Sequence, residues 1–198
     1  MKKVLFMLCL AFTSVGNAQN AIANSAIDIA PLLIGEKIPN ITLKTPDNTD
    51  VNISDLFKNK KTVLVFYRGG WCPYCNAHLQ AMAEAEKQIL ELGYQVIAVS
   101  PDAPENLKIT AEKEKVKYTL LSDSTGELMK AAGIAFKAPE KYKSILKVNS
   151  KGSNKGFLPV PSIFVVNSDS NILFEYIAPN FKHRIMPELL VSVLKNLK

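Results

Sequence analysis

The chain has 198 residues, of which 47% are hydrophobic and 21% charged, as expected for a globular protein with one buried core. Its formal net charge is +6, but the excess is mostly lysine, because the sequence contains only two arginines. Nucleic-acid sites combine arginine forks with stacking aromatic side chains, and the sequence shows no such stripe, so we expect no nucleic-acid partner.

The first 18 residues have the pattern of a secretory signal peptide. Lys2 and Lys3 precede an apolar run over residues 4–15, and residues 16–18 supply the small side chains of a cleavage site. The run is too short to span a bilayer. We therefore expect an exported protein, periplasmic or secreted, without a membrane contact after processing. Processing would also remove Cys9 and lower the net charge to +4.

The mature chain is expected to begin with a flexible leader over residues 19–34, followed by one domain over residues 35–198. Residues 135–158 carry six lysines against one glutamate, which predicts an irregular, solvated insertion. Elsewhere, hydrophobic periodicity predicts strands at 41–43, 51–53, 62–67, 95–99 and 118–121, a hairpin of 162–166 with 172–177, and helices at 73–92, 104–115, 123–133 and 187–197. This order favours an α/β fold in which helices flank a central mixed β-sheet.

The cysteines Cys72 and Cys75 follow the buried strand 62–67 and open the helix that begins at Pro73. Two cysteines at this spacing close too small a loop to stabilise a fold, so the pair is interpreted as redox-active or metal-binding. Free N–H groups and the helix dipole should lower the pKa of Cys72, into a range of about 3.5–7.5. Cys72 would attack a disulfide or peroxide, and Cys75, nearer the core, would form an internal disulfide with it.

Neighbouring side chains complete the predicted site. Trp71 should shield it from one side, while Pro73 and Tyr74 shape the surface that meets substrate. Arg68, four residues before Cys72, is positioned to stabilise a thiolate or orient a peroxide oxygen. A surface arginine is the alternative, and both interpretations are kept.

A metal site is the less favoured interpretation of the pair. Two cysteines supply half of the four ligands of a structural zinc site. His78 is interpreted as a helix-surface residue rather than a third ligand, and His183 as a solvated loop residue. Haem attachment needs a histidine directly after the second cysteine, where Asn76 stands. We therefore expect no metal and no cofactor. Arg184 is likewise expected to be solvated rather than part of the site.

From Gly35 onward the chain resembles the peroxiredoxin group, the alkyl hydroperoxide reductase C and thiol-specific antioxidant family. The stretches that carry the resemblance are IGEKIPNITLKTPDNTDVNISDL, TVLVFYRGGWCPYCNAHLQAM and LPVPSIFVVNSDSNILFEYI. The resemblance implies a thioredoxin-like fold. It also implies a cis bond between Val160 and Pro161, packed against the cysteines, with the Val160 backbone offered to an extended substrate.

One departure from this family affects the expected chemistry. Peroxiredoxins share a Pro-x-x-x-Thr-x-x-Cys stretch, and neither Cys72 nor Cys75 has a threonine three residues before it. The pair resembles instead the Cys-Pro-Tyr-Cys motif of glutaredoxins. We expect an antioxidant enzyme that reduces hydroperoxides through a dithiol–disulfide cycle, recharged by a thioredoxin-like protein or a low-molecular-weight thiol. A protein thiol–disulfide oxidoreductase is the alternative, and a metal-binding domain is a third, less favoured one.

Overall fold

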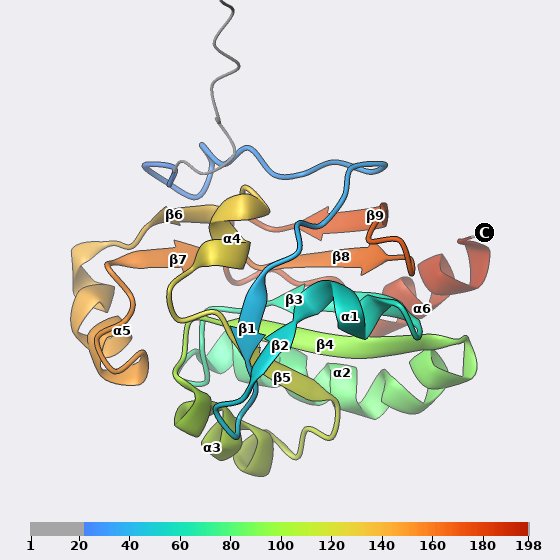
Figure 1. The fold of residues 1–198 in the computed structure, drawn as a ribbon, viewed down its shortest axis with the longest axis horizontal. Helices are drawn as coiled ribbons and strands as arrows, with labels where there is room; N and C mark the ends of the chain where they lie inside the picture. The colour runs from blue at the N-terminus through green and yellow to red at the C-terminus, as the bar shows by residue number, and fades with distance from the viewer. Residues whose placement is uncertain (1–21, 198) are drawn as a thin grey trace, which may run out of the picture.

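The computed structural model describes residues 22–197, so the predicted signal peptide lies outside the described residues. Its centre is a seven-stranded sheet in the order β2-β1-β5-β4-β3-β8-β9 (Figure 1). The bounds of these strands are β1 Thr42–Lys44, β2 Asp50–Asn52, β3 Lys61–Phe66, β4 Tyr94–Ser100, β5 Thr119–Ser122, β8 Ser162–Val166 and β9 Ile172–Ile177. Strands β3, β4 and β5 are parallel, and β8 and β9 are antiparallel additions, so the sheet is mixed as predicted.

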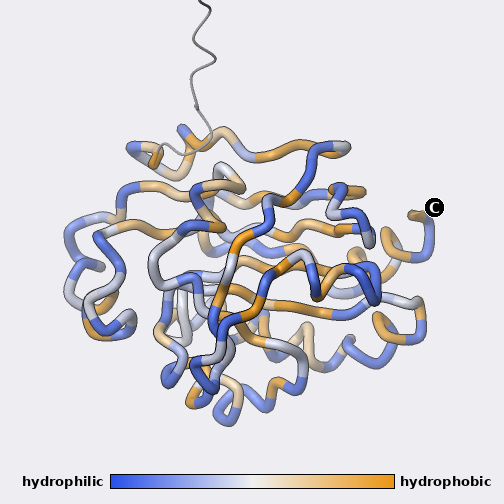
Figure 2. Tube along the Cα trace, viewed as in Figure 1, coloured by the Kyte–Doolittle hydropathy of each residue, from blue (hydrophilic) through white to orange (hydrophobic). Residues whose placement is uncertain are grey.

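Strand β3 is buried on both faces, as its continuous apolar run predicts. Val63 and Val65 point to the core beneath helices α2 and α6, whereas Leu64 and Phe66 point to the core on the opposite face. Figure 2 shows hydrophobic residues along the central strands and many hydrophilic residues in the surrounding loops. This burial fixes the strand end from which the cysteine loop departs.

Six helices accompany the sheet within residues 22–197. Their bounds are α1 Ile53–Phe57, α2 Pro73–Glu91, α3 Pro104–Glu114, α4 Glu127–Ala131, α5 Lys143–Asn149 and α6 Pro187–Asn196. Helix α2 begins at Pro73, which suits a first helical position because the missing N–H has no partner there. It ends before Gly93, whose φ of +84° is the left-handed conformation predicted for a helix stop. No helix in residues 22–197 is long and apolar enough to cross a bilayer.

The part of the leader that is described, residues 22–34, is attached to the domain rather than loose as expected. The Ala23 N–H donates to the Ala135 carbonyl at 3.0 Å, and the Lys137 N–H donates to the Ala23 carbonyl at 2.8 Å. Leu32 is buried, and its N–H donates to the Ala132 carbonyl at 3.1 Å. Figure 1 shows this blue segment running along β6 and α4. Apolar side chains and spare backbone groups therefore hold it in place.

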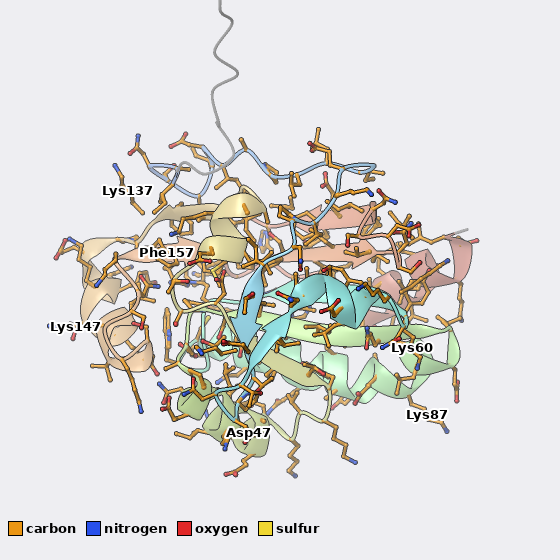
Figure 3. All side chains as sticks on the ribbon, viewed as in Figure 1. Asp47, Lys60, Lys87, Lys137, Lys147 and Phe157 are labelled. Atoms are coloured by element: carbon orange, nitrogen blue, oxygen red, sulfur yellow. The ribbon has the colours of Figure 1, made fainter. Side chains whose placement is uncertain are left out.

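The lysine-rich stretch is also more regular than predicted. It forms strand β6 (Ala135–Lys137), the 3₁₀ turn η2 (Glu140–Tyr142), helix α5 and strand β7 (Phe157–Pro159), which pairs with β6. A small apolar cluster of Ala138, Leu146 and Leu158 holds it together, and Trp71 and Tyr142 pack against that cluster. Its lysines are exposed as predicted, and Figure 3 shows Lys147 at the outer edge of α5.

Candidate active site

The loop between β3 and α2 carries the cysteines and is held from several sides. Gly69 has a φ of +133°, and a Cβ there would collide with the Trp71 indole and lie 2.6 Å from a carboxylate oxygen of Asp102. The Gly70 N–H donates to Asp102 Oδ2 at 2.7 Å, and Asn76 Nδ2 donates to the Gly70 carbonyl at 2.8 Å. The glycines therefore let the loop approach side chains that fix it in place.

Cys72 is the residue before helix α2, and Cys75 lies in its first turn. The N–H groups of Cys75 and Asn76 both donate to the Cys72 carbonyl at 3.0 Å, which brings the two side chains to one end of the helix. Both cysteines are free thiols and both are buried, with exposed fractions of 2% and 1%. The exposed fractions do not show the expected difference, in which Cys72 is accessible and Cys75 lies nearer the core.

The two thiols differ strongly in acidity, as predicted. A hydrogen bond from the Cys75 side chain lowers the pKa of Cys72 to about 6, against the opposing effect of burial, with further help from the Cys75 backbone and from Arg68 and Arg184. Burial raises the pKa of Cys75 well above its usual value, and the neighbouring Cys72 adds to this. Cys72 is thus the thiolate at neutral pH, and Cys75 remains its protonated hydrogen-bond donor.

Arg68 lies inside the site, so its interpretation as a surface arginine is wrong. Only 3% of it is exposed. Its guanidinium carbon lies 4.4 Å from the ring centroids of Tyr142 and Phe181 and 5.2 Å from that of Trp71. Three aromatic faces thus surround this cation. The guanidinium also lowers the pKa of Tyr142.

Arg184 reaches the cysteines from the far end of the chain, so the prediction of a solvated side chain is wrong. Its Nη2 lies 3.3 Å from Cys75 Sγ. Its Nη1 donates to the carbonyls of Phe181 and His183, both at 2.6 Å, and these bonds aim the guanidinium inward. The two arginines, the only ones in a lysine-rich sequence, therefore lie at the same site. Their rarity in the sequence is the signal from which their role could have been predicted.

The other predicted neighbours also lie beside the pair. Trp71 is half-buried and packs against Tyr142, with ring centroids 5.7 Å apart. Tyr74 is 43% exposed and meets the ring of Phe181 edge-on at 5.7 Å. Pro73 is exposed at the start of α2. Their proximity is established, while their contact with a substrate stays a prediction.

The prediction of a cis bond before Pro161 is wrong, because no peptide bond in residues 22–197 is cis. The Val160 backbone is also not offered to a substrate. Its N–H donates to the Ile134 carbonyl at 2.8 Å, and its own carbonyl accepts from Ser162 Oγ at 2.8 Å. Because Val160 is fully buried, these internal bonds occupy both backbone groups. Pro161 lies in the wall of a pocket that also contains Arg68.

The burial of two ionisable groups near the site, His78 and Asp102, was not predicted from the sequence. His78 is buried rather than on the helix surface, and burial together with Arg184 lowers its pKa to about 4. Burial raises the pKa of Asp102 to about 7, although its hydrogen bond from Gly70 opposes this. Within residues 22–197, no group of three or more His, Cys, Asp or Glu side chains could hold a metal ion.

Comparison with known proteins identifies relatives along most of the chain. Residues 34–174 match the family model described as AhpC/TSA family. A putative peroxiredoxin bcp from Haemophilus influenzae is 32% identical over 104 residues, which are 52% of this chain and 66% of that protein. A chloroplastic peroxiredoxin Q from Gentiana triflora is 32% identical over 100 residues, or 50% of this chain and 46% of that one. The matched regions thus span less than two thirds of these relatives.

Solved structures confirm the predicted thioredoxin-like fold. Peroxidoxin BcpB from Mycobacterium tuberculosis superposes with a TM-score of 0.68 at 18% identity, covering 83% of this chain and 97% of its own. Reduced Prx3 from Vibrio vulnificus gives a TM-score of 0.71 at 18% identity, covering 83% and 99%. At such identities the likeness concerns the fold alone.

Proposed function

Because the chain belongs to the AhpC/TSA family, we propose that it is an exported thiol peroxidase that reduces hydroperoxides with Cys72 and Cys75. The observation that carries this proposal is the unequal acidity of two adjoining thiols. A pKa of about 6 makes Cys72 a thiolate at neutral pH, and the thiolate is the nucleophilic form of cysteine.

In the first step the Cys72 thiolate attacks the terminal oxygen of the hydroperoxide. A sulfur–oxygen bond forms, the oxygen–oxygen bond breaks, and the alkoxide takes a proton to leave as an alcohol. Cys72 becomes a sulfenic acid. Arg68 and Arg184 supply positive charge beside the developing oxyanion. This stabilisation does not require the threonine of the Pro-x-x-x-Thr-x-x-Cys stretch.

In the second step Cys75 condenses with the sulfenic acid of Cys72. A sulfur–sulfur bond forms, the Cys72 sulfur–oxygen bond breaks, and water leaves. The position of Cys75 one turn into α2, already a hydrogen-bond donor to Cys72, supports this assignment. Two equivalents of an external thiol, from a thioredoxin-like protein or a small molecule, then reduce the disulfide and are themselves oxidised to a disulfide.

Peroxide turnover with dithiothreitol as the reductant tests the proposal. Consumption of hydrogen peroxide and of cumene hydroperoxide should depend on Cys72, and mass spectrometry should find its sulfenic acid in Cys75→Ser. A protein that leaves both peroxides unconsumed after full reduction is not a peroxidase.

A protein thiol–disulfide oxidoreductase is the second candidate. It is favoured by the absence of a threonine three residues before either cysteine and by the acidic first cysteine of a Cys-Pro-Tyr-Cys pair. Reduction of insulin disulfides at a rate above that of dithiothreitol alone, without peroxide consumption, would select this function.

Export forms a separate part of the proposal and is supported by the lysines and apolar run of residues 1–18. Amino-terminal sequencing of the protein recovered from the periplasm or the medium should find a start near Gln19. Recovery of an uncleaved chain from the cytoplasm would contradict it.

A further inference from the structure

A pocket of about 300 Å³ lies next to the cysteine site but does not include either cysteine among its lining residues. Its walls come from leader residues 24–26, from the β6–η2 stretch and from Arg68, Pro161, Pro179 and Phe181. We call it the Arg68 pocket. Its volume is at the lower end of the range for small-molecule sites.

The charge at its inner end has no carboxylate partner in residues 22–197. Arg68 is 97% buried, and it takes part in none of the ion pairs formed by residues 22–197. Its Nε atom has no hydrogen-bond partner in that part of the chain. Aromatic contacts and the Cys72 thiolate offset only part of the cost of burying this charge, and planar guanidinium groups pair best with carboxylates.

The rest of the lining fits a ligand with an apolar body and a negative charge. Phe136, Tyr142 and Phe181 supply aromatic walls, and the exposed Lys137 and Lys141 add positive charge. None of the lining side chains is acidic. Figure 3 shows Lys137 on the outer edge of the molecule beside the leader, where it is reached from solvent.

We propose that the Arg68 pocket binds a small organic carboxylate, with the carboxylate paired to the Arg68 guanidinium and the apolar body held between Phe136, Tyr142 and Phe181. The occupied pocket would give Arg68 the carboxylate partner that residues 22–197 do not provide. The pocket shares Arg68 with the cysteine site, but carboxylate binding does not require peroxidase activity.

Ligand binding should nevertheless be linked to Cys72. Arg68 helps to stabilise the Cys72 thiolate, so a carboxylate that neutralises Arg68 weakens this stabilisation. By thermodynamic reciprocity the thiolate must weaken carboxylate binding to the same degree. The carboxylate should therefore bind more tightly when Cys72 is oxidised or protonated than when it is a thiolate.

Trp71, the only tryptophan, gives a direct readout because it contacts both Arg68 and Tyr142. Fluorescence and calorimetric titrations of the folded protein should show saturable binding of phenylacetate. Its uncharged analogue 2-phenylethanol should bind at least about tenfold more weakly, as expected for loss of a charge-assisted hydrogen bond. Equal binding of the two compounds, or saturable binding of neither, would overturn the proposal.

Two variants locate the binding. Arg68→Gln should weaken phenylacetate binding about tenfold or more by removing the charge. Ala26→Leu, in the leader wall, should weaken it similarly by filling the pocket while leaving Arg68 in place, so it decides the question if Arg68→Gln does not fold. Ala81→Leu is the matched control, because Ala81 lines a different hollow between α2 and α6 and its variant should bind like wild type. Unchanged binding in Ala26→Leu would place the ligand elsewhere.

The carboxylate could belong to a hydroperoxide substrate or to a thiol reductant, and two kinetic arms distinguish these sources under the proposed function. A carboxylate-bearing hydroperoxide is compared with its methyl ester in the peroxidase assay. In the absence of peroxide, 3-mercaptopropionate is compared with 3-mercaptopropanol as a reductant of the diamide-oxidised protein. If one assay shows a preference for the charged compound, and Ala26→Leu abolishes this preference, that assay identifies the source of the carboxylate. If the protein has no peroxidase activity, the binding titration still tests the proposal.

Discussion

The surroundings of Cys72 and Cys75 differ although the two residues lie one helical turn apart. Cys72 accepts hydrogen bonds from Cys75 and is flanked by the positive charges of Arg68 and Arg184, so its pKa falls to about 6. Cys75 is buried among apolar side chains, and burial raises its pKa even though Arg184 Nη2 is only 3.3 Å away. This comparison indicates that the reactivity of Cys72 depends on groups from distant parts of the fold and not on the start of helix α2 alone.

The largest expected effect comes from removing each thiol in turn. Cys72→Ser should lower hydroperoxide reduction by at least about a thousandfold, because the nucleophile is lost. Cys75→Ser should still complete the first reaction with peroxide and then stop at the Cys72 sulfenic acid. Single-turnover peroxide consumption and intact mass spectrometry measure both results. A burst in Cys72→Ser that is absent in Cys75→Ser would reverse the two roles.

Selective alkylation should report the difference in acidity directly. Only thiolates react readily, so iodoacetamide at about pH 6–7 should modify Cys72 about a hundredfold faster than Cys75. The labelling rate of Cys72 should rise with pH through a midpoint near its pKa of about 6. Peptide mass spectrometry after a short pulse identifies the labelled residue, and equal labelling would contradict the asymmetry. The urea-unfolded protein is the control, in which both thiols should label alike.

Removing the charge of Arg184 should reduce the difference between the thiols. In Arg184→Met the pKa of Cys72 should rise by about one unit, because a nearby positive charge stabilises the thiolate, leaving up to about tenfold less thiolate at a given pH. Arg184→Lys keeps the charge and should retain most of the effect. Thiolate absorbance near 240 nm during a pH titration of Cys75→Ser provides the measurement. An unchanged midpoint in Arg184→Met would show that Arg184 acts only through packing.

The last expected effect concerns Asp102 and the pH dependence of stability. Its pKa is raised from 3.8 to about 7 in the fold, so the unfolded chain ionises first as pH rises. Asp102 should therefore lower the free energy of unfolding between about pH 4 and 7, by at most about 1.4 kcal/mol per pH unit.

Urea denaturation across this range should show wild type losing stability relative to Asp102→Asn as pH rises. The exposed Asp169→Asn should run parallel to wild type and serves as the control. If the Asp102→Asn curve also ran parallel to that of wild type, the buried Asp102 carboxyl would not be uncharged in the folded protein. Thiolate titration of the same variant tests whether Asp102 also influences Cys72.

The sequence was sufficient to predict the central sheet with its flanking helices and to single out Cys72 and Cys75. The apolar run of β3, the proline at the start of α2 and the glycine after it are local signals, and all three predictions hold. Cys72 and Cys75 are close in sequence as well as in space, so their spacing alone indicated a redox-active or metal-binding pair.

The parts that escaped prediction depend on contacts between distant segments. Arg184 meets Cys75 across 109 positions, and Tyr142 reaches Arg68 from a stretch whose lysines suggested only a solvated insertion. His78 falls on a helix face that is covered by another element rather than by water. The Val160 N–H donates a hydrogen bond to the Ile134 carbonyl, and no sequence pattern around Pro161 predicts this bond. Tertiary partners decide such positions, and local periodicity does not specify them.

The leader has a consequence for where the chain can be shortened. Ala23 bridges Phe136 and occupies the side of β6 that β7 leaves open, whereas the family match begins only at residue 34. A recombinant protein trimmed to that boundary would uncover a free strand edge beside apolar surface, the kind of edge along which identical chains pair and aggregate. Trimming at residue 22 instead should keep the edge covered and the protein in solution.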